Sequence, residues 1–270
     1  MKKILFINSL KKDYEIIKQI TVRDIQLRFR GSRLGRLWSI INPIIMLSIY
    51  TFVFSQVFKA RWGDVDTIQD DTYMYAMNLF CGLIIFNIFG ECMSRAPSLI
   101  TSNPNFVKKI RFPIHALGHM IAGSTIYQAL SSIGILLVFK LIYTTELNLT
   151  ILSLPVILLS IYLKCLGLIW LISSASVYLK DISQVISASI SMLMFLSPVF
   201  YPIESLPDKI QWIATLNPIA NSIEQARDIL LDGSVPAFEN ICIQSIVLIL
   251  WCEFGFRVLQ KLEKGFGDLL

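Results

Sequence analysis

The stretch FRGSRLGRLWSIINPIIMLSIYTF, residues 29–52, changes from strongly basic to uncharged within a few positions. Four arginines fall within nine residues: Arg28, Arg30, Arg33 and Arg36. The run 37–58 that follows has no charged side chain. A helix rises about 1.5 Å per residue, so about 20 apolar residues cross a hydrocarbon core that is about 30 Å thick. The stretch therefore predicts a membrane-spanning helix whose arginines stay among the lipid headgroups, with Trp38 at the boundary.

The composition of the whole chain supports the same interpretation. Of its 270 residues, 54% are hydrophobic and only 16% are charged, and the mean hydropathy is +0.63. Soluble domains carry about 25% charged residues. Because only helices satisfy every backbone group of such long apolar blocks without water, we predict an all-α integral membrane protein. The six predicted transmembrane helices lie at about 37–58, 72–92, 115–140, 150–178, 183–201 and 240–259.

Lysine and arginine are distributed unevenly between the two sides of these spans. Six spans place both termini on one side, and that side receives eighteen of the 24 basic residues. Basic residues gather on the cytoplasmic side of membrane proteins. Residues 1–36 are therefore predicted to be a cytoplasmic N-terminus with an interface helix, residues 37–262 the membrane domain, and residues 263–270 a cytoplasmic tail.

Two cytoplasmic segments have helical signals of their own. Residues 13–30 read as a basic amphipathic helix in the interface plane, which serves either to hold a cytoplasmic partner or simply as an anchor. The loop SNPNFVKKIRFP contains a short helix at about 102–111, with Asn103 as its N-cap and Pro104 at its first position. This short helix either pushes against a moving partner or only reverses the chain.

On the outer side, the segment 204–233 has a core at 210–223 that is apolar but too short to cross a bilayer. Pro207 and Pro218 divide the segment into two helical pieces. We expect an outer helical hairpin that dips into the membrane, either as a lid over an exit or as a passive plug. Pro198 and Pro43 are expected to kink the spans in which they lie.

A search for catalytic or energy-coupling groups finds little. The phosphate-loop lookalike GHMIAGS at 118–124 has Ser124 where the lysine belongs. His115 and His119 lie four apart without a third ligand, and the five cysteines form no CxxC pair, so we expect no metal site and no disulfide framework. The only deep charge, Lys164, costs about 2.5–3.5 kcal/mol at a helix centre, and it either contacts an anionic substrate or binds carbonyls of a neighbouring helix. A separate protein must supply the energy.

The order and spacing of five segments resemble ABC-2 type permeases that export polysaccharides such as O-antigen, teichoic acid or capsule chains. These segments are RDIQLRFRGSRLGRLWSIINPIIMLSIYTFVFSQVF (23–58), NPNFVKKIRFPIHAL (103–117), YLKDISQV (178–185), SPVFYPIESLPDKIQWIATLNPIANSIEQARDILLDG (197–233) and FRVLQKLEKGFGDLL (256–270). The resemblance implies a homodimer in the bacterial inner membrane with two cytoplasmic ATPase subunits. These subunits would bind ATP and Mg²⁺, so the chain itself would be no enzyme and hold no cofactor. The substrate would be a polysaccharide on a polyprenyl lipid, with no role for nucleic acid.

The resemblance also implies roles for individual residues. Those expected to contact the ATPase are Arg23, Asp24, Ser102, Asn103, Pro104, Asn105, Lys108, Lys109 and Arg111. Spans one and five would line the channel. Sugar rings stack on aromatic side chains, which makes Tyr50, Phe54, Phe58, Phe195, Phe200 and Tyr201 candidates for the substrate path, together with Lys164. Guanidinium groups suit phosphate, which makes Arg30, Arg33 and Arg36 candidates for the entrance of the lipid diphosphate.

Purely structural roles also fit these residues. The aromatic side chains would equally suit a core or a lipid-facing surface, and the arginines would equally anchor the topology. Two other functions also stay open: a permease for a small amphiphile, and a membrane transferase acting on polyprenyl lipids. The absence of clustered acids disfavours the transferase.

Overall fold

A computed structural model describes residues 6–53, 70–108, 112–144, 148–205, 209, 211–212, 217–235 and 238–269. These residues form helices and no strand, which confirms the predicted all-α class. The long helices are α3 (Trp38–Phe52), α4 (Asp70–Arg95), α6 (His115–Thr144), α7 (Leu154–Tyr178), α8 (Ile182–Leu196) and α11 (Phe238–Leu262). The shorter elements are α1 (Phe6–Lys12), α2 (Tyr14–Arg28), η1 (Gly35–Leu37), α5 (Pro104–Lys108), η3 (Leu149–Ser153), η4 (Ile203–Ser205), α10 (Ala220–Arg227), the π-helical turn η5 (Asp228–Asp232), η6 (Glu263–Gly265) and α12 (Phe266–Leu269).

Four helical stretches are long and apolar enough to cross a membrane, which makes this a multi-pass membrane protein. They are Tyr73–Arg95, His115–Thr144, Leu149–Tyr178 and Ile243–Gly265. The apolar helix α8 has only 15 residues and ends at Leu196, just before the Ser197-Pro198 pair. Helix α3 also has 15 residues and carries Pro43 inside it, and residues 54–69 that follow it lie outside the described ranges. The count of six spans therefore stays a prediction.

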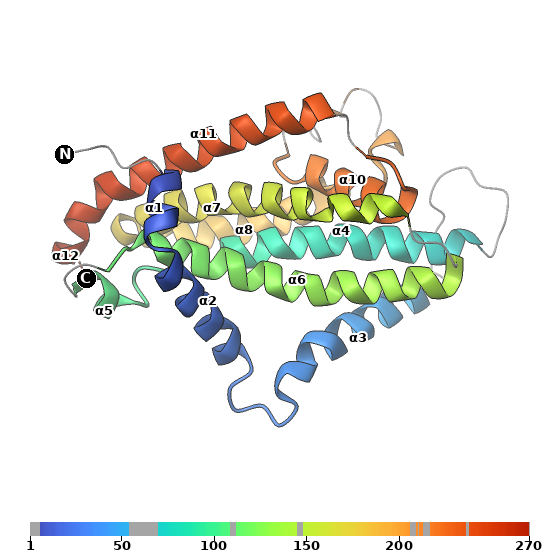
Figure 1. The fold of residues 1–270 in the computed structure, drawn as a ribbon, viewed down its shortest axis with the longest axis horizontal. Helices are drawn as coiled ribbons and strands as arrows, with labels where there is room; N and C mark the ends of the chain where they lie inside the picture. The colour runs from blue at the N-terminus through green and yellow to red at the C-terminus, as the bar shows by residue number, and fades with distance from the viewer. Residues whose placement is uncertain are drawn as a thin grey trace.

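Helix α4 lies at the centre of the bundle. It packs against α3, α6, α7, α8 and α10. Of its most apolar stretch, 83% is buried, against 28% for α6 and for α11, so α6 and α11 must face lipid instead. Figure 1 shows α1, α2, α5 and α12 gathered at one end of the long helices and α10 at the other.

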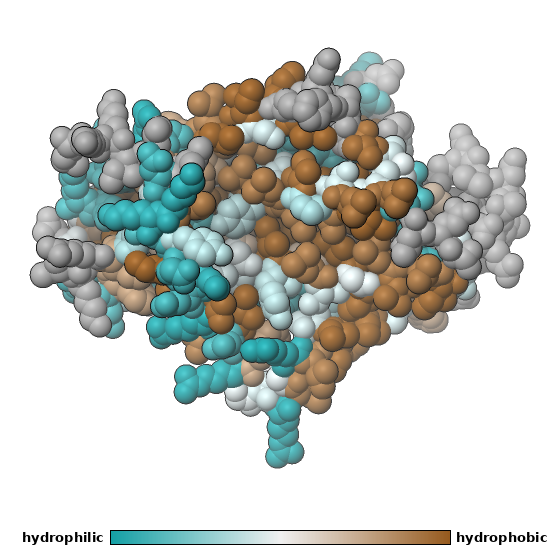
Figure 2. All heavy atoms as spheres, viewed as in Figure 1, coloured by the Kyte–Doolittle hydropathy of each residue, from teal (hydrophilic) through white to brown (hydrophobic). Residues whose placement is uncertain are grey.

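The surface of the bundle matches this division. Figure 2 shows apolar side chains over the middle of the molecule and hydrophilic ones at the end where α1 and α2 lie. Large apolar side chains that are more than half exposed include Val138, Ile142, Leu159, Ile246, Leu250 and Phe254. So much exposed apolar surface is unfavourable in water and is expected where lipid covers the helices.

Glycines let α7 and α11 approach closely. A Cβ atom at Gly255 would lie 2.7 Å from the backbone oxygen of Gly167, so no larger residue fits there. The Trp251 indole donates to the carbonyl of Lys164 at 3.4 Å, and the Cys252 thiol to that of Leu163 at 3.0 Å. Close contact between small residues is a main source of helix association in membranes, where the hydrophobic effect does not act between helices.

Buried cations hold the outer hairpin. Lys140 of α6 donates to the carbonyls of Leu230 and Leu231 at 3.0 and 2.9 Å, and Arg227 of α10 is 2% exposed. Cations suit the end of a helix, where carbonyls are left unpaired. The first piece of the expected hairpin, including Pro207, lies largely outside the described residues.

Candidate functional site

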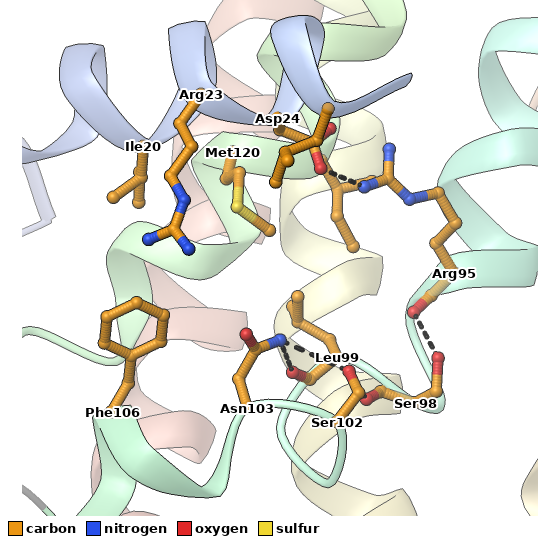
Figure 3. Close-up of a pocket in the computed structure, with 12 residues that line it drawn as sticks. Ile20, Arg23, Asp24, Arg95, Ser98, Leu99, Ser102, Asn103, Phe106 and Met120 are labelled. Atoms are coloured by element: carbon orange, nitrogen blue, oxygen red, sulfur yellow. Dashed lines mark hydrogen bonds and ion pairs between the residues drawn. The ribbon is translucent and has the colours of Figure 1, made fainter. Parts of the chain in front are cut away.

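A groove of about 310 Å³ lies at the hydrophilic end, between α2 and the chain that leads into α5. Figure 3 shows Arg23 of α2 reaching across this groove toward Phe106 of α5. The next residue, Asp24, turns the other way and meets Arg95 at the end of α4. The structure thus brings Arg23 beside the short helix with which it was expected to bind an ATPase, and places Asp24 inside the protein.

Asp24 belongs to a network of four charges that the sequence analysis missed. Nη2 of Arg95 lies 2.7 Å from Oδ1 of Asp24, and Nη1 of Arg95 lies 3.4 Å from Oε1 of Glu91. Arg28 pairs with the same Glu91 oxygen, and both arginines donate to the Ser124 hydroxyl at 3.3 Å. The side chains are only 14–30% exposed, and their charges sum to zero. The network fastens α2 to α4 and α6. We call these four charged residues the α2 anchor.

The loop before α5 is built by local hydrogen bonds. Asn103 directly precedes α5, at the N-cap position that the sequence predicted, and its backbone oxygen accepts from the amide of Phe106. Its side-chain amide donates to the carbonyl of Leu99 at 2.9 Å. Pro104 opens the helix as expected. Phe106 stacks on Phe112 at 4.4 Å. Among the residues expected to contact the ATPase, Ser102, Asn105 and Lys108 are exposed, whereas Lys109 and Arg111 lie outside the described residues.

The C-terminal tail packs against the same region. Phe266 of α12 is fully buried, with its ring 6.1 Å from that of Tyr178, and the Tyr178 hydroxyl donates to the carbonyl of Leu262 at 2.9 Å. Helix α12 also contacts α5. The tail therefore packs against α5 and supports it, a contact that the sequence did not indicate.

Replacing Phe266 by alanine should release the tail from Tyr178 and α5 without unfolding the long helices, because α12 contacts only the end of the bundle. A buried Phe→Ala change costs about 3–5 kcal/mol in a rigid core, and a terminal segment relaxes by undocking instead. We expect faster hydrogen exchange in residues 104–108 and 262–269, measured by mass spectrometry. Leu269→Ala, at an exposed position on the same helix, is the matched control. Unchanged exchange in α5 would contradict the supporting role.

The expected substrate-path residues fall into two groups. Tyr50 lines a cavity of about 520 Å³ among α3, α4, α6 and α8. At the end of α8, Phe195 stacks on Phe200 with ring centroids 6.0 Å apart, and the Tyr201 hydroxyl donates to the carbonyl of Phe195 at 3.2 Å. Phe195 is 71% exposed, so this aromatic cluster presents a ring to the outside of the single chain. Phe54 and Phe58 lie outside the described residues.

Lys164 is separate from both groups. Its Nζ atom donates to the Ser222 hydroxyl of α10 at 2.7 Å, on a side of α7 that does not line the cavity around Tyr50. Of the two readings that the sequence left open, a structural bond to a neighbouring helix matches this geometry, although the acceptor is a hydroxyl and not a carbonyl.

The three entrance arginines share one exposed connection. Arg30, Arg33 and Arg36 are exposed between α2 and α3. Figure 1 shows this connection standing away from the long helices. Two glycines with positive φ, Gly31 at 86° and Gly35 at 50°, shape it, and such angles strain other residues. No ion pair between described residues uses these three guanidinium groups.

The two histidines bind α1 and α2 to the bundle. His115 lies 3.3 Å from Asp13, at the start of α2, and His119 is fully buried beside the Tyr162 hydroxyl, with Phe6 of α1 stacked over it. Within the described ranges, no three metal-ligating side chains come together. These contacts fit a packing role for both residues.

Comparison with known proteins shows that the sequence is similar to a family of membrane transporters. A profile of the ABC-2 type transporter family matches residues 15–231. The chain is 25% identical over 261 residues to the O-antigen export system permease protein RfbA of Klebsiella pneumoniae, covering 95% of each protein. It is 21% identical to RfbA of Myxococcus xanthus, covering 98% of this chain and 99% of that protein. It is 24% identical to the polysialic acid transport protein KpsM of Escherichia coli, covering 92% and 94%.

Proposed function

This chain belongs to the ABC-2 type transporter family, and from that premise we propose that it is the membrane subunit of an exporter of lipid-linked polysaccharide. The observation that carries the proposal is the match to an O-antigen export permease over 95% of both chains. The family profile, which matches residues 15–231, includes the interface helix, the short helix α5 and the helices around the cavity. The substrate that fits best is an O-antigen-like chain on a polyprenyl diphosphate.

The energy comes from a separate ATPase that binds ATP and Mg²⁺. Helix α5 and the groove beside Arg23 would receive it on the cytoplasmic face, with both termini on that side. The distribution of basic residues supports this orientation, because α1, α2, α5 and α12 lie at one end of the bundle. Tail contacts and the α2 anchor hold this docking surface in place.

The exporter works as a pair of these chains with two ATPase subunits. A cavity that opens on one chain beside α3 and α8 supports a shared path between two copies, and a twofold dimer is the simplest closed arrangement. Arg30, Arg33 and Arg36 would receive the lipid diphosphate, and the Phe195 cluster would guide sugar rings near the outer side.

A direct test is to purify the chain with its partner ATPase, reconstitute the complex in vesicles, and follow polysaccharide movement to the ATP-free side. Transport should require ATP and the lipid-linked chain. The double change Lys108→Glu and Lys109→Glu should weaken ATPase docking, because reversed charges at an interface repel. We expect export to fall about tenfold or more per milligram of inserted protein, which corresponds to roughly 1.4 kcal/mol of docking free energy or more.

Lys261→Glu, an exposed lysine of α11, is the matched control and should leave export unchanged. ATP-independent transport driven by an ion gradient would refute the proposal, and so would activity of the chain with no ATPase present. Normal export by the double variant would remove α5 from the docking surface.

Polysialic acid is the second candidate substrate, because KpsM, a relative of similar identity, is named for polysialic acid transport. The two candidates predict the same complex. They differ in which purified lipid-linked glycan stimulates ATP hydrolysis.

A further inference from the structure

The cavity around Tyr50 has an unusual wall for the interior of a membrane bundle. Three helices contribute polar side chains to its 520 Å³, and the remaining wall is apolar or aromatic. The polar side chains are Asn42 of α3, Asn87 and Glu91 of α4, and Thr125, Gln128 and Ser132 of α6. Polar groups within membrane segments are costly and mark pathways or binding sites.

Among these residues, Thr125 gives the strongest evidence for a ligand in the cavity. It is 2% exposed, and its hydroxyl oxygen is buried without a hydrogen-bond partner among the described residues. Three other threonines, Thr21, Thr51 and Thr144, each donate to the carbonyl four residues earlier at 2.7 to 2.9 Å. A buried hydroxyl that is left unpaired is unfavourable, so its position beside a cavity indicates a partner supplied from the cavity.

Other polar side chains in the cavity wall can also bind a partner from the cavity. No hydrogen bond between described residues uses the side chains of Asn42, Asn87, Gln128 or Ser132. Amides and hydroxyls both donate and accept hydrogen bonds. The wall therefore presents a mixed set of donors and acceptors from three helices toward one space.

A second depression differs from the cavity around Tyr50 because its wall is apolar, as expected for a surface that faces lipid. Between α3 and α6 lies a space of about 450 Å³ whose wall is almost wholly apolar, including Leu47, Leu130 and Val138. Of the two serines in this wall, Ser48 donates to the carbonyl of Ile44 at 2.8 Å. An acyl chain suits that depression, whereas in the cavity around Tyr50 it would leave amides unpaired.

We propose that the cavity lined by Asn42, Asn87, Thr125 and Gln128 is a binding niche for sugar rings of the exported chain. The inference rests on the proposed export function and names the part of the path where sugars are held by hydrogen bonds. Sugars present many hydroxyls and one apolar ring face, and the niche pairs its polar groups with the aromatic ring of Tyr50. The volume falls within the range of about 300–1,000 Å³ that is typical of small-molecule pockets.

The niche also touches the α2 anchor. Glu91 lines the niche and at the same time pairs with Arg28 and Arg95, which hold α2 in place. A sugar bound there lies next to the charges that fasten the interface helix. We therefore expect a sugar that binds in the niche to stimulate ATP hydrolysis by the complex, which can be measured.

The first test measures ATP hydrolysis by the complex in lipid nanodiscs against the concentration of lipid-linked polysaccharide. Thr125→Val removes the hydroxyl and keeps the shape. The concentration for half-maximal stimulation should rise about three- to tenfold, the range for one neutral hydrogen bond, with the maximal rate unchanged. Thr125→Ser, which keeps the hydroxyl, should stay within about twofold of the parent. Thr51→Val, whose hydroxyl is bonded within its own helix, is the matched control.

The second test places the photoreactive residue benzoylphenylalanine at position 87, at position 50, or at position 254 on the exposed face of α11. With ATP withheld, glycan adducts are expected at 87 and 50 and absent at 254. Glycan adducts at 50 alone, with no shift for Thr125→Val, would overturn the niche while leaving the export function standing. Lipid adducts at 87 in place of glycan would also overturn it. No stimulation by any glycan and no adduct at any position would refute both.

Discussion

Arg227→Leu is expected to cause one of the largest losses of stability of any single change in the described bundle. The Arg227 guanidinium donates to the carbonyl of Asn78 at 3.2 Å, to that of Val199 at 3.0 Å, and to Glu224 at 2.9 Å. Its side chain is 3% exposed. One residue thereby joins α10 to α4 and to the chain that follows α8.

The loss of stability in Arg227→Leu comes from the hydrogen-bond partners that the substitution leaves unpaired. A leucine removes three hydrogen bonds from a charged donor and leaves Glu224 without this cation. Removing one partner of a buried ion pair costs about 3–5 kcal/mol. For a chain of this size that corresponds to a fall of roughly 6–20 °C in melting temperature in detergent, measured by the temperature dependence of monodisperse protein.

Two other arginine variants make the result specific. Arg257→Leu breaks the pair with Glu253 at 2.7 Å, but Arg257 is 55% exposed, and an exposed pair contributes about 0–1 kcal/mol. It should melt close to the parent. Arg227→Lys keeps the charge and loses the fork of donors, so it should fall between the two. Equal melting temperatures for Arg227→Leu and Arg257→Leu would contradict the proposed role in holding the outer hairpin.

Some of the architecture could be predicted because it depends on neighbours in sequence. Uncharged blocks indicate spans by length alone, and α4, α6, α7 and α11 begin or end within a few residues of charges or prolines. Pro104 marks the start of α5, and Ser197-Pro198 marks the end of α8. Each of these signals is local, so one sequence is enough to read it.

What could not be predicted depends on partners that are distant in sequence. A count of charges cannot show that Lys140 and Arg227 are buried, because each donates to a carbonyl that is distant in sequence, 90 and 149 positions away. Asp24 and Arg95 are 71 residues apart, and no periodicity brings them together. The sequence did carry a weak signal, since Asp24 with Arg28 and Glu91 with Arg95 are opposite charges four apart at the ends of helices. Only the packing of α2 on α6 turns these two pairs into one network.

That network carries the second large effect. Arg95→Asp would place three carboxylates together at the junction of α2 and α4, because Asp24 and Glu91 both face Arg95. Each lost hydrogen bond to a charged group contributes about 1.5–3 kcal/mol, and like charges repel further. Helix α2 should loosen from the bundle, and transport should fall on the order of a hundredfold, since two such bonds are lost and about 1.4 kcal/mol corresponds to a factor of ten. ATP hydrolysis by the complex should fall less, because the ATPase still binds nucleotide.

Reversing the charges of Asp24 and Arg95 together tests whether their ion pair fastens α2. The double variant Asp24→Arg with Arg95→Asp restores an opposite pair at the same place, and Arg28 keeps its contact with Glu91. Because the two positions interact directly, the double variant should recover at least about a tenfold share of the lost transport, a coupling of about 1.4 kcal/mol. Arg23→Asp, at the neighbouring exposed position on α2, cannot be rescued by Arg95→Asp and serves as the control. If the losses of the two single variants simply add in the double variant, the pair does not fasten α2, and the coupling of α2 to the spans must depend on Arg28 and Glu91 alone.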